Sequence, residues 1–321
     1  MLTPEWALDP LPPMTGAAAR TFVVGGATGF IGAHLVRRLL ARGDRVIVVT
    51  RRPRHALARF GPQVTILTAP EALPAATQVD GIVSLAGAPI LHTPWTRGRR
   101  ALLLHSRVAT VGALAALSQR LERPPAAFVA ASAIGYYGVR GDEALDEGAG
   151  GTEDFQSQLV QRWEAAAGAA QRAGTRAVML RFGVVLGRDG GALAQLARPV
   201  RAFAGTILGS GAQWVSWIHI EDLIALLLFG LDEPRASGVF NAVAPGAVRH
   251  ATLQRELARV LHRPLWFRVP AGLVRLTLGE MAQLLVDGQR VVPARALAVG
   301  FPFRFPELRA ALEDLYGVPG R

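Results

Sequence analysis

The sequence lacks two residue types that many catalytic and binding sites need. None of its 321 residues is cysteine, so disulfide bonds, thiolate metal ligands and cysteine nucleophiles are excluded. None is lysine either, because all 35 residues counted as lysine or arginine are arginine. A Schiff base, the lysine of a phosphate-binding P-loop and a tyrosine–lysine catalytic pair are therefore excluded as well.

Charged residues are few. Only 18% of the residues are charged and 50% are hydrophobic, a balance that favours a folded core over disorder. The formal net charge is +11, yet the arginines form only short clusters, such as residues 51–54 and 97–100. The sequence has no long basic tail and no aromatic-interleaved RNA motif, so we expect a solvated basic surface and no nucleic-acid partner.

Long apolar runs are missing too. The longest, residues 223–231, is about nine residues long, whereas a membrane-spanning helix needs ~20, so we expect no membrane as a partner. The first residues include Glu5, Asp9 and several prolines instead of the basic and apolar regions of a secretory signal. We expect a flexible extension over residues 1–19, with Met14 as an alternative start, and a cytoplasmic protein.

Apolar strands alternate with helices from residue 21 onward. The predicted strands are residues 21–25, 46–49, 64–67, 81–85, 127–131 and 176–182, and the longer helices are residues 31–40, 99–121 and 156–173. This alternation is typical of parallel βαβ units with both sheet faces covered. It predicts an α/β fold, a Rossmann-type doubly wound parallel sheet over residues 20–185, with a ligand crevice at the carboxyl ends of the strands.

The pattern changes after residue 185. Glycine and proline become frequent, and the predicted elements are shorter: helices at residues 223–231 and 253–261, and isolated strands at residues 213–218 and 238–242. We therefore expect a smaller α+β C-terminal domain over residues 186–321 that covers the crevice.

Three glycines stand between the first strand and the first helix. Gly26, Gly29 and Gly32 suit a tight turn, a close approach of the backbone to a pyrophosphate, and close packing of helix on strand. The second strand is followed by Thr50, Arg51 and Arg52, where a cofactor with a free ribose 2′-hydroxyl usually meets a carboxylate. A hydroxyl and two guanidinium groups suit a 2′-phosphate instead, so NADP(H) is the predicted cofactor.

Several longer segments resemble the extended short-chain dehydrogenases/reductases, and within them an uncharacterised NAD(P)-dependent epimerase/dehydratase-like branch. The resemblance covers about residues 21–316 and rests on residues 25–32, 83–90, 106–107, 132–138, 162–164, 181–187, 209–211, 217–222 and 301–312. It implies a small-molecule substrate. A homodimer through the long helices on one sheet face is common in the wider superfamily and is a further expectation.

The resemblance also assigns the cofactor-binding residues. It implies that the pyrophosphate lies against Gly26, Gly29, Phe30, Ile31 and Gly32, and the adenosine ribose against Thr50 and Arg51. The segment running under the cofactor would be Leu85, Ala86 and Gly87, with Arg107 reaching it from the following helix and Val184 and Val185 bordering the nicotinamide.

The superfamily's catalytic Tyr-x-x-x-Lys pair has no counterpart here, because its two positions match Phe155 and Leu159. Ser132 and Tyr137 are the predicted proton donors in its place, with packing or a hydrogen bond to substrate as the alternative role of Tyr137. His219 is a third titratable candidate or a structural histidine. Glu164 and Asp222 are interpreted as structural carboxylates, Asp222 as a helix cap. No histidine–carboxylate spacing indicates a metal site.

Two functions stay open. The first is an NADP-dependent oxidoreductase or epimerase with a non-standard proton donor. The second is a catalytically silent NADP(H)-binding sensor or scaffold. A polar crevice favours the first, and the missing dyad favours the second.

Overall fold

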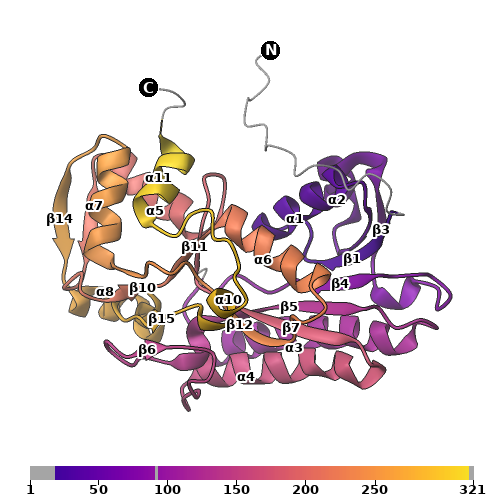
Figure 1. The fold of residues 1–321 in the computed structure, drawn as a ribbon. Coiled ribbons are helices and arrows are strands. Elements are labelled where there is room, and N and C mark those ends of the chain that lie inside the picture. The colour runs from indigo at the N-terminus through magenta and orange to yellow at the C-terminus, as the bar shows by residue number, and fades with distance from the viewer. Residues whose placement is uncertain (1–18, 91–92, 318–321) are drawn as a thin grey trace.

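The computed structural model describes residues 19–90 and 93–317 (Figure 1). Apart from Ala19, the predicted N-terminal extension and Met14 lie outside the described residues. The centre of the molecule is a seven-stranded sheet in which every neighbouring pair of strands is parallel. Its order is β12 (Gly238–Ala242), β7 (Arg176–Phe182), β5 (Ala127–Ala133), β4 (Gly81–Ser84), β1 (Thr21–Gly25), β2 (Arg45–Val49) and β3 (Val64–Leu67). The predicted doubly wound parallel sheet is confirmed.

Helices cover both faces of this sheet because successive strand residues point to opposite sides. Phe22 and Val24 of β1 face one apolar cluster, which contains α1 (Phe30–Ala41), α2 (Pro53–Phe60) and α6 (Ile220–Asp232). Val23 lies between them in sequence and packs into the opposite cluster, which contains α3 (Arg97–Arg120) and α4 (Phe155–Gly168). The sheet is thus buried on both sides, as its nearly uninterrupted apolar strands predict.

Several helix ends follow from local sequence. Thr96 caps α3 by accepting a hydrogen bond from the backbone of Arg99, and Asp154 caps α4 by accepting from Gln156 and Ser157. Gly43, with a φ of +86°, lies just beyond the end of α1, as expected of a residue that must leave the helix in the left-handed region. A 3₁₀ helix, η4 (Ala169–Ala173), continues α4 to the end predicted for it.

Two elements from beyond residue 185 belong to the central layers. The strand at residues 238–242 was predicted to be an isolated strand of the C-terminal region, which is wrong: it is β12, and it pairs in parallel with β7 along its whole length. Helix α6 packs against the sheet beside α1. The chain thus crosses back into the sheet after leaving it, and the division at residues 185 and 186 stays a prediction.

The remaining elements form the smaller α+β region. It contains four two-stranded pairs: β8 (Val184–Leu186) with β11 (Trp217–His219), β9 (Gly205–Leu208) with β14 (Leu265–Val269), β10 (Trp214–Val215) with β13 (Val248–Arg249), and β6 (Ala144–Leu145) with β15 (Arg290–Val291). Its helices are α5 (Gly191–Arg201), α7 (His250–Val260), α8 (Ala271–Leu278), α9 (Gln283–Val286), α10 (Ala294–Ala298) and α11 (Leu308–Tyr316). Trp217, Leu257 and Leu312 lie in its apolar core.

Among the described residues, α3 alone is a helix long and apolar enough to cross a membrane by length and composition. Val111, Leu114 and Leu117 of α3 are buried against the central sheet. The core helices of globular domains can be equally long and apolar, and the packing of α3 on the sheet identifies it as such a core helix.

Candidate functional site

The glycine-rich loop lies at the carboxyl end of β1. Gly26 has a φ of +81°, and a Cβ atom on it would stand 2.7 Å from the backbone nitrogen of Ala86. A Cβ atom on Gly32 would collide with the carbonyl oxygen of Gly26. These two glycines are therefore required by the loop's own backbone, whether or not a ligand is bound.

Gly29 has a different role. Its φ is −73°, and a Cβ atom on it would contact only the carbonyl oxygen of Gly26, at 3.3 Å. It is the N-cap residue of α1, makes no side-chain cap, and is followed by no acidic residue in the first turn. The backbone N–H groups at this helix start, and the positive end of the helix dipole, are thus available to an anion.

The side chains of Phe30 and Ile31 point into the protein. The Phe30 ring lies so close to Gly187 and Gly190 that a Cβ atom on either glycine would collide with it. Ile31 packs against the main apolar cluster. Any contact that these two residues make with a pyrophosphate would therefore come from their backbone, and Phe30 links α1 to the loop after β8.

The segment after β4 lies beside the glycine loop, as predicted. The backbone N–H of Leu85 donates to the carbonyl oxygen of Gly25 at 2.9 Å, and Ala86 touches Gly26. Gly87 follows, and a Cβ atom on it would be 3.3 Å from the guanidinium carbon of Arg107. The structure thus brings these predicted residues together at the carboxyl ends of β1 and β4.

Arg107 is a half-buried cation at this position. Its Nη1 donates to the carbonyl oxygen of Leu103 and its Nη2 to that of Ala88, while its guanidinium lies 5.1 Å from the Trp163 ring centre. Burial, with a contribution from Arg99, lowers the pKa of Arg107 to about 10, so it remains charged at neutral pH. No carboxylate of the described residues lies within salt-bridge distance of it. An anionic ligand here would meet an unpaired cation.

The end of β2 carries the predicted ribose-binding residues. The Oγ1 atom of Thr50 accepts a hydrogen bond from the backbone of Arg52, and the side chains of Arg51 and Arg52 are exposed. A further cation was not predicted: Arg59 of α2 donates from Nη1 to the carbonyl oxygen of Thr28, within the glycine loop. Only the short helix α2, which the sequence analysis did not predict, places Arg59 there.

Val184 and Val185 lie on β8, directly after β7. The backbone N–H of Val184 donates to the carbonyl oxygen of Ser216 at 2.8 Å, and β8 pairs in parallel with β11. The side chains of both valines are half-buried. They therefore follow the carboxyl end of a central strand, which is where the resemblance puts a nicotinamide border. That contact itself stays a prediction.

A buried hydrogen-bonded network joins β5, α4 and β7. The Ser132 hydroxyl donates to Oε1 of Glu164 at 2.5 Å. Arg181 donates to both oxygens of Glu164, from Nε at 2.8 Å and from Nη2 at 2.9 Å. Nη1 of Arg181 donates to the Tyr137 hydroxyl, which in turn donates to Oδ1 of Asn241 at 2.7 Å. Glu164 thus accepts hydrogen bonds from two other members of the network, and its purely structural role stays an interpretation.

The network encloses both predicted proton donors. Ser132 and Tyr137 lie at the carboxyl end of β5, and both are buried with their hydroxyl groups bonded within the protein. Burial raises the pKa of the Tyr137 phenol, and Arg181 offsets only part of that rise. Their catalytic roles stay predictions. The neighbouring Tyr136, which the sequence analysis did not assign to the site, is half-buried, and its ring centre lies 3.4 Å from the Arg181 guanidinium.

The two residues at the positions of the superfamily's Tyr-x-x-x-Lys pair, Phe155 and Leu159, pack in an apolar cluster. Phe155 packs edge-to-face on Trp95, and Leu159 lies in the same cluster with Met281. This cluster joins α4 to the segment before α3 and to the 3₁₀ helix η5 (Gly279–Ala282).

His219 is a structural histidine. It is buried, its Nδ1 accepts the backbone N–H of Glu221 as the cap of α6, and its Nε2 lies 3.3 Å from Asp314. The prediction that Asp222 caps a helix is therefore wrong. The carboxylate of Asp222 instead accepts the backbone N–H groups of Arg304 and Phe305, because it points away from the helix start toward the C-terminal segment.

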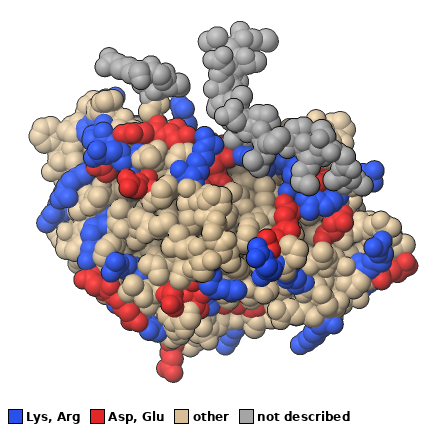
Figure 2. All heavy atoms as spheres, in the orientation of Figure 1, with Lys and Arg blue, Asp and Glu red and all other residues tan. Residues whose placement is uncertain are grey.

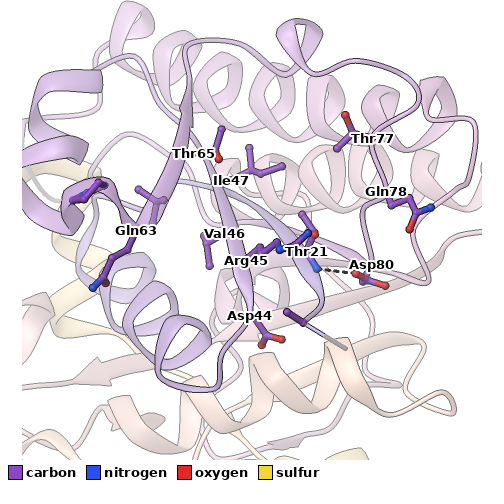
Figure 3. Close-up of a pocket in the computed structure, with 13 residues that line it drawn as sticks. Thr21, Asp44, Arg45, Val46, Ile47, Gln63, Thr65, Thr77, Gln78 and Asp80 are labelled. Atoms are coloured by element: carbon purple, nitrogen blue, oxygen red, sulfur yellow. Dashed lines mark hydrogen bonds between the residues drawn. The ribbon is translucent and has the colours of Figure 1, made fainter. Parts of the chain in front are cut away.

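A cavity of about 590 Å³ lies at the other end of the sheet (Figure 3). Thr21, Asp44, Thr65 and Asp80 line it, at or near the amino ends of β1, β2, β3 and β4, respectively. Parallel strands place these residues at the end of the sheet opposite the glycine loop, so this cavity is separate from the predicted ligand crevice.

Comparison with known proteins identifies relatives over nearly the whole chain. The model of the NAD dependent epimerase/dehydratase family matches residues 22–243, and a domain of unknown function, DUF1731, matches residues 269–315. The mouse epimerase family protein SDR39U1 is 40% identical over 299 residues, covering 91% of this chain and 98% of the relative. An epimerase family protein of Staphylococcus haemolyticus is 37% identical over 303 residues, covering 92% and 99%.

A solved structure is similar as well. The crystal structure of human SDR39U1 (isoform 2) with NADPH has a TM-score of 0.83 and 37% identity, and the match covers 92% of this chain and 99% of the human chain.

Proposed function

Because this chain belongs to the NAD-dependent epimerase/dehydratase family of extended short-chain dehydrogenases/reductases, we propose that it binds NADP(H) and uses it as an oxidoreductase or epimerase on a small molecule. The glycine loop carries this proposal. Gly26 and Gly32 hold a turn that no other residue permits, and the loop ends in a helix start that no side chain caps. Such a helix start is a ready-made site for a pyrophosphate.

The choice of NADP(H) over NAD(H) follows from the residues around the end of β2. Thr50 and Arg51 follow the strand, and Arg59 reaches the same loop from α2. Guanidinium groups bind a phosphate in a planar, bidentate manner. The human relative crystallised with NADPH is consistent with this choice.

When bound, NADP(H) supplies a hydride acceptor or donor. Arg107 would contribute a positive charge to the phosphate groups at Gly87, and β8 would carry the two valines beside the nicotinamide. Ser132 and Tyr137 are proposed to exchange the substrate proton through the network held by Arg181, whose guanidinium provides the positive charge that the superfamily takes from lysine.

A second candidate function is a catalytically silent NADP(H)-binding sensor or scaffold. The observation that favours it is the enclosure of Tyr137, whose hydroxyl is bonded to Arg181 and Asn241 away from solvent. Phe155 and Leu159 are likewise packed in an apolar cluster.

Two measurements separate these functions. Fluorescence titrations with NADPH and NADH test cofactor binding, and absence of binding to either would remove both functions. A screen of carbonyl compounds for oxidation of NADPH then tests catalysis. If a substrate is found, Tyr137→Phe should lower turnover by ~10²–10⁴-fold at unchanged cofactor affinity, the usual worth of general acid–base catalysis. If no compound oxidises NADPH above the blank, the silent function takes precedence.

A further inference from the structure

Strand β14 and the following helix α8 lie at the outer edge of the molecule in Figure 1, and both carry exposed large apolar side chains. Four large side chains within eleven residues are more than half exposed: Trp266 at 71%, Phe267 at 55%, Leu273 at 51% and Leu276 at 83%. We call these four residues the β14–α8 surface. Single exposed apolar residues need no explanation, but four in one short stretch do.

The backbone of this region holds the aromatic side chains outward. The pairing of β14 with β9 shifts by one residue at Trp266, so that Leu265 lies opposite Gly205 while Phe267 lies opposite Thr206. Such a bulge redirects a side chain and commonly lies next to a functional surface. Just before β9, the exposed Phe203 has a φ of 59°, a strained conformation for a residue other than glycine.

Two unpaired cations lie on or beside the β14–α8 surface. Residues 257–279 contain four arginines, of which Arg259 pairs with Glu256 and Glu313, and Arg275 pairs with Asp287. Within the described part of the chain, Arg263 and Arg268 have no carboxylate within salt-bridge distance, and the Arg263 guanidinium lies 4.6 Å from the Phe203 ring centre. Figure 2 shows basic side chains along the edge that β14 occupies in Figure 1. An anionic partner would complement this charge.

We propose that the β14–α8 surface binds an anionic phospholipid membrane surface. Protruding tryptophan and leucine side chains flanked by arginine suit the boundary between headgroups and acyl chains, where the apolar groups insert and the guanidinium groups contact phosphates. A second copy of this chain fits less well, because it would bring the same unpaired arginines and a net charge of +11 against the first. The proposal departs from the expectation of no membrane partner, which rested on the shortness of the apolar runs and which nothing in the structure tests.

Sedimentation with sucrose-loaded vesicles tests the proposal on the full chain. Vesicles of phosphatidylcholine alone are compared with a phosphatidylcholine–phosphatidylserine mixture, at low and at high salt. We expect binding to the mixture to be ~10–30-fold stronger, as two arginines at an anionic surface would give, and to weaken as salt is raised. The double variant Trp266→Ser, Leu276→Ser should lose at least ~10-fold in binding.

Matched variants identify the surface. Two control variants change residues elsewhere: Leu297→Ser removes a half-exposed leucine on α10, and Arg123→Gln removes an exposed arginine beyond α3. Both controls should bind vesicles as the wild type does. Arg268→Gln, on β14, should bind them more weakly. Unchanged NADPH affinity in each variant shows that it is folded. The proposal would be overturned if the wild type did not bind the mixed vesicles, or if the double variant bound them equally well. It would also be overturned if the wild type did not bind vesicles but formed a dimer that the double variant abolishes.

Discussion

Arg181 and Glu164 form a bidentate ion pair inside the protein. Nε of the arginine donates to Oε1 of the carboxylate at 2.8 Å, and Nη2 donates to Oε2 at 2.9 Å. The pair links α4 to the carboxyl end of β7. It also sets the directions of two neighbouring side chains, because Ser132 donates to the same carboxylate and Tyr137 receives the remaining Nη1 group of the arginine. The positive charge near the predicted proton donors therefore comes from β7 rather than from a lysine on α4.

Replacing Glu164 with glutamine should destabilise the protein strongly. The Arg181 guanidinium would stay buried without its counter-charge, and loss of one partner of a buried pair costs ~3–5 kcal/mol. Urea denaturation should show this loss. The matched control is Glu233→Gln, which removes the charge that pairs with the exposed Arg235 and should lower the free energy of unfolding far less. Equal losses for the two variants would contradict the structural role of the buried pair.

The glycine loop should separate folding from cofactor binding. In Gly32→Ala the new Cβ atom meets the Gly26 backbone, so the free energy of unfolding should fall. In Gly29→Val the backbone φ of −73° is acceptable to valine, and the new side chain lies where a pyrophosphate would approach. Thermal unfolding of Gly29→Val should therefore change little while its NADPH affinity collapses. A folded Gly29→Val protein that binds NADPH normally would remove the assignment of this loop.

Protonation of His250 should make the protein less stable in mild acid. The side chain is buried on α7, neither ring nitrogen has a hydrogen-bond partner among the described residues, and burial lowers its pKa below the usual 6.5. The unfolded chain therefore binds this proton at a higher pH than the folded protein does. The stabilisation from a neutral His250 is fully present above about pH 6.5 and is lost as the pH falls from there through the lower folded pKa.

The slope can reach about 1.4 kcal/mol per pH unit for one proton. Denaturation midpoints of wild type and His250→Gln between pH 5 and 7 measure it, with His105→Gln, an exposed histidine of α3, as the control. The His250 variant should give the flatter profile, whereas the control should follow the wild type. A wild-type profile that is already flat over this range would contradict the effect.

The parallel sheet and its glycine loop were predictable because apolar strands of four to seven residues alternate with helices, and because a strand–glycine–helix junction has few other physical uses. The return of β12 to the sheet was not predictable in this way. Its five residues read as a strand, but their periodicity carries no information on which strand they pair with. The orientation of Tyr137 depended on the 3₁₀ helix η3 (Ile134–Tyr137), which turns Tyr137 inward and leaves Tyr136 half-exposed. Arg59 was missed because its position follows from tertiary structure alone.

Cofactor preference should depend on Arg51. NADPH differs from NADH by one phosphate of nearly two negative charges, and the end of β2 offers it Thr50 and an exposed guanidinium with no carboxylate directly after the strand. Charge-assisted hydrogen bonds contribute ~1.5–3 kcal/mol each, so NADPH should bind ~10–100-fold more tightly than NADH.

Arg51→Ala should abolish most of this difference by weakening NADPH binding alone, because only the phosphate loses its partner. Paired fluorescence titrations at fixed ionic strength measure it, with Arg54→Ala, on the exposed first turn of α2, as the control for general charge effects. Arg59→Ala should weaken both cofactors if its guanidinium serves the pyrophosphate at the loop, and NADPH alone if it serves the 2′-phosphate. Equal affinities of the wild type for NADPH and NADH would instead make Arg51 a surface charge and the cofactor assignment wrong.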